Sequence, residues 1–77
     1  MPHIEIKCYP GRTEEQKRAL AEKITEDVVT IFKTEESNVS VAIYDVSQDE
    51  WQEEVWDKQI APSLGKLYKE PGYDYND

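Results

Sequence analysis

Residues 13–32, TEEQKRALAEKITEDVVTIF, decide the fold because they predict one long amphipathic helix. The apolar positions that recur at helical spacing are Leu20, Ile24, Val28, Ile31 and Phe32. Thr13 and Gln16 have the spacing of a capping box, in which the threonine hydroxyl accepts a hydrogen bond from a free backbone N–H of the first turn. We therefore expect a helix from Glu14 to about Phe32.

Two segments with the character of β-strands flank this helix. Residues 3–9 alternate apolar and polar side chains, and Pro10-Gly11 then supplies turn chemistry before the helix. Residues 39–46 are rich in β-branched side chains. A strand, a helix and a strand in this order predict an α+β fold built on a β-α-β unit, with parallel strands and a right-handed crossover.

The chain after the second strand predicts a shorter helix and an irregular tail. Ser47 and Glu50 repeat the capping-box spacing, which favours a helix from about Gln48 to Lys58. Pro71-Gly72 ends regular structure, so residues 69–77 are expected to be irregular. We expect residues 1–77 to form a single domain.

Composition limits the classes of partner and compartment. The net charge of −8 argues against nucleic acid or an anionic membrane as a partner. One cysteine, Cys8, excludes an intrachain disulfide and fits a reducing compartment. Neither a signal peptide nor an apolar run of about 20 residues is recognisable, so a cytoplasmic protein is expected.

The small size predicts self-association. The chain has 77 residues, of which 38% are hydrophobic, so its core is thin. Two strands and one helix leave one face of the sheet uncovered. We expect a second copy to pair with the sheet and extend it to four strands.

Pro2 is a candidate general base. Removal of Met1 is favoured by a small second residue, and it would leave a secondary amine at the start of a strand. An α-amino group titrates near about pH 8, and burial or a neighbouring cation lowers its pKa. Such a nitrogen could accept and return a proton. The alternative interpretation is that a Met-Pro start only protects the chain from degradation.

Other candidate groups have two interpretations each. Arg12 could bind a carboxylate in bidentate fashion or pair with Glu14 or Glu15 at the helix start, and these interpretations are equally supported. We assign Trp51 to the wall of an apolar pocket and Trp56 to packing. Two further side chains are assigned to structure, His3 as a histidine on the sheet face and Cys8 as a core residue. The spacing of His and Cys predicts no metal site, and no cofactor is expected.

Three stretches of the chain are distinctive together: PHIEI at 2–6, PGRTEEQK at 10–17 and NVSV at 38–41. They resemble the 4-oxalocrotonate tautomerase family over roughly the first two thirds of the chain, and the remainder resembles a bacterial phenylpyruvate-type member. The resemblance implies a β-α-β fold and an amino-terminal proline, here Pro2, that acts as general base. It implies that Arg12 binds a substrate carboxylate and that Trp51 lines the pocket. Ser40 stands where the family has a second arginine that polarises the 2-keto oxygen.

These correspondences imply an isomerase without a cofactor that interconverts the enol and keto forms of a 2-oxo acid. Because Ser40 supplies no second cation, an aromatic monocarboxylate such as enol-phenylpyruvate is expected to be preferred over a dicarboxylate. The alternatives are a dehalogenase or decarboxylase of the same superfamily, and a non-catalytic dimeric binding module. A homodimer is expected first and a hexamer second, because the predicted helix after Ser47 replaces the glycine-rich hairpin of hexameric members.

Overall fold

The computed structural model describes residues 1–75 and divides the chain into two compact units, Met1–Asp45 and Val46–Asp77. The first unit contains all of the β-structure in the described residues, and the second contains only helical segments and irregular chain. Each unit has its own internal contacts. The boundary follows the last residue of the second strand.

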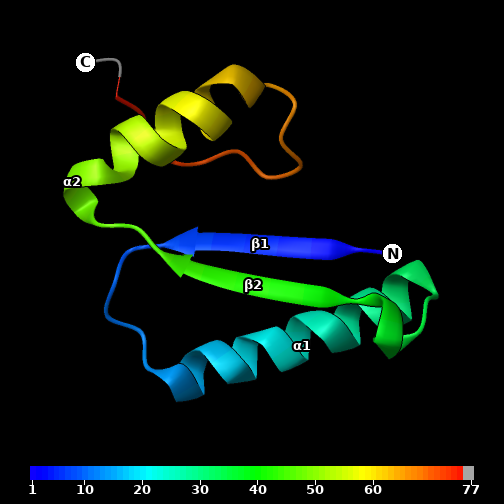
Figure 1. Cartoon of the computed structure of the whole chain (residues 1–77). Helices are drawn as coiled ribbons and strands as arrows, with labels where there is room; N and C mark the ends of the chain where they lie inside the picture. The colour runs from blue at the N-terminus through cyan, green and yellow to red at the C-terminus, as the bar shows by residue number, and fades with distance from the viewer. Residues whose placement is uncertain (76–77) are drawn as a thin grey trace. The chain divides into compact units, whose positions relative to one another are not determined.

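The first unit is the predicted β-α-β unit. It consists of β1 (His3–Cys8), α1 (Glu14–Phe32), a short 3₁₀ turn η1 (Glu36–Asn38) and β2 (Ser40–Asp45). The two strands are parallel and in register from His3 opposite Ser40 to Cys8 opposite Asp45. Figure 1 shows α1 running along one face of this sheet, with the amino terminus at the end of β1 opposite to the connection that leads into α1.

Local chemistry fixes both ends of α1. The predicted capping box is present: the Gln16 N–H donates to Thr13 Oγ1 at 3.1 Å, and the Thr13 N–H donates to Gln16 Oε1 at 2.8 Å. At the other end Lys33 has φ 58°, a left-handed conformation, and its N–H donates to the Val29 carbonyl. This reversal ends the helix after Phe32, where the spacing predicts it.

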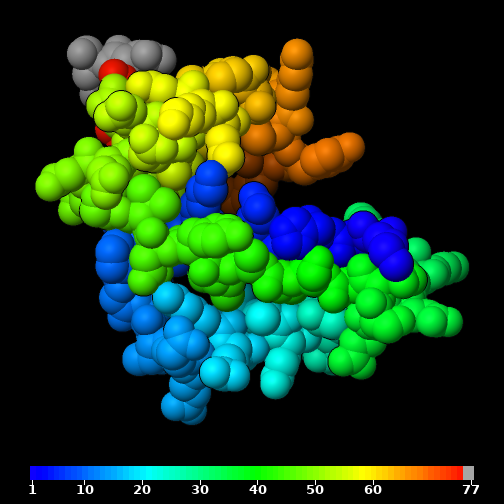
Figure 2. Space-filling view, viewed as in Figure 1, coloured from blue at the N-terminus to red at the C-terminus, as the bar shows by residue number. Residues whose placement is uncertain are grey.

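The first unit leaves its apolar side chains incompletely covered. None of residues 1–45 is buried, although the sheet face towards α1 is half-buried. Ile31 and Phe32 are 73% and 68% exposed. Long side chains at the end of α1 and in the following turn project outward in Figure 2. The β-α-β unit of one chain therefore has no closed core of its own.

The second unit begins as the predicted helix but changes its winding. Ser47 caps α2 (Gln48–Trp51) by accepting the Glu50 N–H at 3.3 Å. The helix continues as a π-helix, η2 (Gln52–Ile60), followed by a 3₁₀ turn, η3 (Ala61–Ser63). The helical winding extends to Ile60, two residues past the expected end at about Lys58, and Pro62 follows in η3.

The π-helix also changes where its aromatic residues point. In a π-helix each N–H bonds the carbonyl five residues earlier, as the Ala61 N–H does to Trp56. Trp51 and Trp56 are five residues apart, and both contact Tyr73. The α-helical spacing would have separated them on the helix surface. Trp56 and Val55 are the buried side chains of residues 1–75, at 3% and 4% exposure.

The tail has no helix or strand up to Tyr75, in agreement with the predicted irregular segment 69–77, of which residues 76 and 77 lie outside the described part. It is nevertheless held in place. The Glu70 carboxylate accepts the N–H groups of Gly65 and Leu67 at 2.8 and 3.0 Å. Within residues 1–75, no helix has the length and apolarity needed to cross a membrane.

Candidate active site

Pro2 is fixed at the amino-terminal end of β1. It is half-buried, and its carbonyl accepts the Ser40 N–H at 3.2 Å. This bond extends the sheet pairing by one residue beyond His3. Met1 is 99% exposed, so no packing opposes its removal. Without Met1, the Pro2 nitrogen is a secondary amine on a residue whose backbone is tied to the neighbouring strand.

Polar side chains surround this end of the sheet on the face away from α1. The ring nitrogen His3 Nδ1 lies 2.6 Å from Ser40 Oγ. On its other side, His3 Nε2 lies 3.6 Å from Glu5 Oε1. The His3 and Glu5 side chains are 54% and 50% exposed, so this cluster is accessible in the single chain. His3 lies on the sheet face, as predicted, and the strand register brings it to Ser40.

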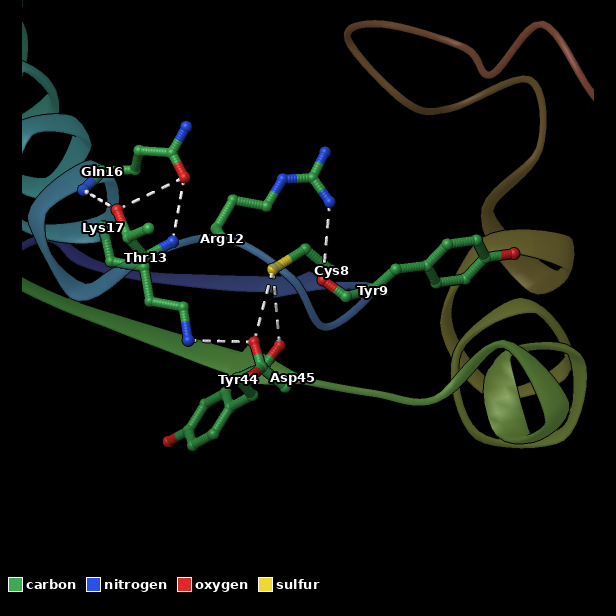
Figure 3. A network of polar contacts seen from close by, with 8 residues as sticks. All are labelled: Cys8, Tyr9, Arg12, Thr13, Gln16, Lys17, Tyr44 and Asp45. Atoms are coloured by element: carbon green, nitrogen blue, oxygen red, sulfur yellow. Dashed lines mark hydrogen bonds and ion pairs between the residues drawn. The ribbon is translucent and has the colours of Figure 1, made fainter.

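Arg12 lies beyond the opposite, carboxyl end of β1. Its Nη1 donates to the Tyr9 carbonyl at 3.5 Å (Figure 3). The predicted alternative pairing with Glu14 or Glu15 is not formed in the described residues, and Glu14 instead lies 3.9 Å from Arg18. The Arg12 guanidinium thus contacts a backbone carbonyl and, among the described residues, is not neutralised by a carboxylate.

A cleft of about 200 Å³ adjoins Arg12. It is lined by Ile6, Cys8, Arg12, Gln16, Lys17, Leu20 and Ile43. Lys17 Nζ lies 3.0 Å from Asp45 Oδ1, and this hydrogen bond raises the pKa of Lys17 above its ordinary value (Figure 3). Because Asp45 neutralises Lys17, Arg12 is the cation of this cleft that contacts no carboxylate within residues 1–75.

A larger hollow of about 600 Å³ lies between α1 and Val41, and its lining is partly acidic. Glu22, Glu26 and Glu36 are among its lining residues. These carboxylates repel an anionic ligand, and none of the predicted site residues contributes to this hollow.

One chain brings Pro2 and Ser40 together but separates both from Arg12. Pro2 precedes the first residue of β1, and Arg12 follows its last residue by four positions. A strand of six residues spans about 20 Å. A small substrate at the Pro2 nitrogen is therefore out of reach of the Arg12 of the same chain.

Trp51 belongs to an aromatic cluster of the second unit. Its indole Nε1 donates to Tyr73 Oη at 3.0 Å. The Trp56 ring contacts those of Tyr73 and Tyr75 at centroid distances of 5.4 and 5.2 Å. Trp56 is a packing residue, as predicted. Sequence reasoning missed Tyr73 and Tyr75, although two aromatic residues in an otherwise polar tail are the signal that could have found them.

No group of three or more His, Cys, Asp and Glu side chains in residues 1–75 is arranged to hold a metal ion.

The comparisons with known proteins agree with this architecture. The family described as "Tautomerase enzyme" matches residues 2–56. Tautomerase PptA of Enterobacter sp. (strain 638) is 47% identical over 74 residues, which cover 95% of this chain and 97% of that protein. Tautomerase PptA of Escherichia coli (strain K12) is 42% identical over 77 residues, covering 99% of both chains.

Two solved structures are similar to this chain. The crystal structure of YwhB, a homologue of 4-oxalocrotonate tautomerase, has a TM-score of 0.60 and 40% identity, covering 62% of this chain and 79% of that one. A 4-oxalocrotonate tautomerase isozyme from Methylibium petroleiphilum has a TM-score of 0.61 and 33% identity, covering 62% and 75%.

Proposed function

The chain belongs to the tautomerase family and is an isomerase, and from this premise we propose that it interconverts the enol and keto forms of a 2-oxo acid with Pro2 as general base. The observation that carries the proposal is the backbone bond between Pro2 and Ser40, which fixes the amine at the end of a paired strand. A base in a fixed position transfers a proton more efficiently than a frayed terminus, because the transfer occurs over hydrogen-bond distances.

The proposed reaction needs only one proton carrier. With Met1 removed, the Pro2 nitrogen accepts the proton of the enol hydroxyl, and the C=O bond forms as the C=C electrons shift towards C3. The protonated amine then gives the same proton to C3, which forms the C–H bond and restores the free amine. No cofactor or second substrate enters this balance.

We further propose that the substrate is an aromatic monocarboxylate such as enol-phenylpyruvate. Arg12 would bind its single carboxylate in bidentate fashion. Trp51 would line the apolar part of the pocket, and Ser40 would contact the substrate at the Pro2 end. Because the Ser40 side chain is uncharged, it would not form an ion pair with a second carboxylate of a dicarboxylate substrate.

The separation of Pro2 and Arg12 supports a shared site between copies. If both groups contact one substrate, the Arg12 must come from another chain. The uncovered apolar side chains of residues 1–45 favour such an assembly. We propose a homodimer with a four-stranded sheet, with a hexamer as the second choice.

Residues 1–77 would act as a single tautomerase domain, and the family match from 2 to 56 spans both compact units. We propose the cytoplasm as the compartment, because a single cysteine fits a reducing environment.

Replacement of Pro2 tests the proposed function. Pro2→Ala keeps an amine but makes it primary and removes the ring, so ketonisation of enol-phenylpyruvate should slow by about 100-fold or more. Pro62→Ala makes the same residue replacement at an exposed internal site, where the nitrogen is an amide, and should retain the rate. Full activity of Pro2→Ala would exclude Pro2 as the base. A strong preference of the unmodified chain for 2-hydroxymuconate would refute the substrate class.

A further inference from the structure

Glu5, His3 and Ser40 form a chain of polar contacts that ends beside Pro2. Ser40 Oγ lies 2.6 Å from His3 Nδ1, and His3 Nε2 lies 3.6 Å from Glu5 Oε1. The three side chains come from adjacent strands and share the sheet face away from α1, since His3 is paired with Ser40 and Glu5 is two residues further along β1. The strand register therefore fixes the cluster.

The position of Ser40 suits a contact to the substrate oxygen. The Ser40 N–H donates to the Pro2 carbonyl at 3.2 Å. The Ser40 hydroxyl is three covalent bonds from this N–H nitrogen, and the Pro2 nitrogen is three covalent bonds from this carbonyl oxygen. These bonds limit their separation to about 10 Å. The proposed reaction brings the enol oxygen within hydrogen-bond distance of the Pro2 nitrogen, so this oxygen would also lie near the Ser40 hydroxyl.

The hydrogen-bond capacity of the cluster decides what Ser40 can do. A serine hydroxyl carries a single hydrogen, so it cannot donate to His3 and to a substrate together. When Nδ1 of the ring carries hydrogen, it donates to Ser40 Oγ, and the hydroxyl hydrogen is free to point elsewhere. On the other side of the ring, Nε2 faces the Glu5 carboxylate at 3.6 Å, which orients the imidazole. The cluster can then present the Ser40 O–H as a donor.

We propose that Ser40 donates a hydrogen bond to the enol or enolate oxygen of the substrate, and that His3, held by Glu5, is a positioning residue that directs the Ser40 hydroxyl towards it. This inference rests on the proposed function of Pro2. The hydroxyl hydrogen stays on Ser40, and the transferred proton still moves from the substrate oxygen to Pro2 and on to C3. The hydrogen bond stabilises the negative charge that develops on the oxygen between these two transfers.

The test compares two residues of the same shape at position 40. Ser40→Thr and Ser40→Val differ only in the hydroxyl, and both suit a strand, so their folding should match. Ser40→Thr should keep kcat within a few-fold of the unmodified enzyme. Ser40→Val should lower kcat for enol-phenylpyruvate by about 100-fold, as for the loss of one oxyanion donor, with a smaller change in KM. Ser37→Ala, at an exposed serine in η1, is the control and should be neutral.

Variants of His3 test the positioning role. His3→Phe should lower kcat by about 10-fold. His3→Asn, which keeps a short-range N–H donor, should restore most of that loss. In the Ser40→Val background, His3→Phe should cause no further loss, because His3 would act only through the hydroxyl.

The outcomes separate this inference from the proposed function. Equal kcat for Ser40→Thr and Ser40→Val, with Pro2→Ala inactive, would overturn the role of Ser40 and leave Pro2 as the base. An equal loss from His3→Phe in both backgrounds would overturn the positioning role. Full activity of Pro2→Ala would overturn the proposed function, and the inference would fall with it.

Discussion

The two compact units differ in the relation between regular backbone and burial. Residues 1–45 have a capped α-helix and two parallel strands in register, yet none of their side chains is buried. The second unit has an irregular winding of α-, π- and 3₁₀-helix, yet it contains the buried Val55 and Trp56. The regular unit is therefore the one whose exposed apolar surface the proposed homodimer would cover. The irregular unit is held by its own aromatic contacts.

The largest expected effect is the loss of Trp56. Trp56→Ala removes a side chain that is 3% exposed and the ring contacts with Tyr73 and Tyr75. It should lower the free energy of unfolding by about 3–5 kcal/mol. Urea denaturation followed by far-UV circular dichroism measures this. A cost below about 1 kcal/mol would break the comparison, because the second unit would then have no internal core.

The next effect concerns the uncovered surface of residues 1–45. If another copy covers it, the apparent free energy of unfolding should rise by about 1.4 kcal/mol for each tenfold increase in protein concentration, as mass action requires for a dimer. Light scattering on the same samples should give twice the chain mass. A monomer whose unfolding midpoint does not depend on concentration would contradict the account of this unit.

A smaller effect is expected at the hydrogen bond between Trp51 and Tyr73. Tyr73→Phe keeps the ring against Trp56 but removes the acceptor of the Trp51 N–H, so it should cost about 0.5–1.5 kcal/mol. Tyr68→Phe is the matched control, because Tyr68 is fully exposed, and it should stay within about 0.5 kcal/mol of the unmodified chain. Equal effects of the two variants would mean that the tail is not fixed through Trp51.

The smallest effect is a pH dependence within the first unit. The hydrogen bond to Asp45 raises the pKa of Lys17 above 10.5, so the folded chain holds this proton at a higher pH than the unfolded chain. Its stabilisation is complete below that value and is lost as the pH rises through the raised pKa. Thermal unfolding between about pH 9 and 12 should therefore show a steeper decline for the unmodified chain than for Lys17→Met. Parallel declines would argue against the pair.

The difference between the two compact units also shows which features could be predicted from the sequence. The helix 14–32 and its cap were predicted correctly because hydrophobic period and capping chemistry are local. The π-winding of η2 was not predicted, because the capping and apolar spacing of this segment are equally compatible with an α-helix. The ring contacts of Trp56 with Tyr73 and Tyr75 join residues far apart in sequence, so the sequence could not supply them.

The candidate site divides in the same way. Pro2, Arg12, Ser40 and Trp51 could be singled out by residue type and by resemblance. The contact between His3 and Ser40 could not, because it depends on the exact register of β1 against β2. The separation of Pro2 and Arg12 follows from the predicted strand between them, and the structure confirms it, since Pro2 precedes β1 and Arg12 follows it.

The most direct test of the central claim is a ¹⁵N NMR titration of the Pro2 nitrogen in protein whose intact mass confirms the loss of Met1. The account predicts that the nitrogen loses its proton below the ordinary α-amino range of about pH 7.7–8.0, so that a free base exists at neutral pH. A retained Met1, or a nitrogen that stays protonated above about pH 9, would contradict it.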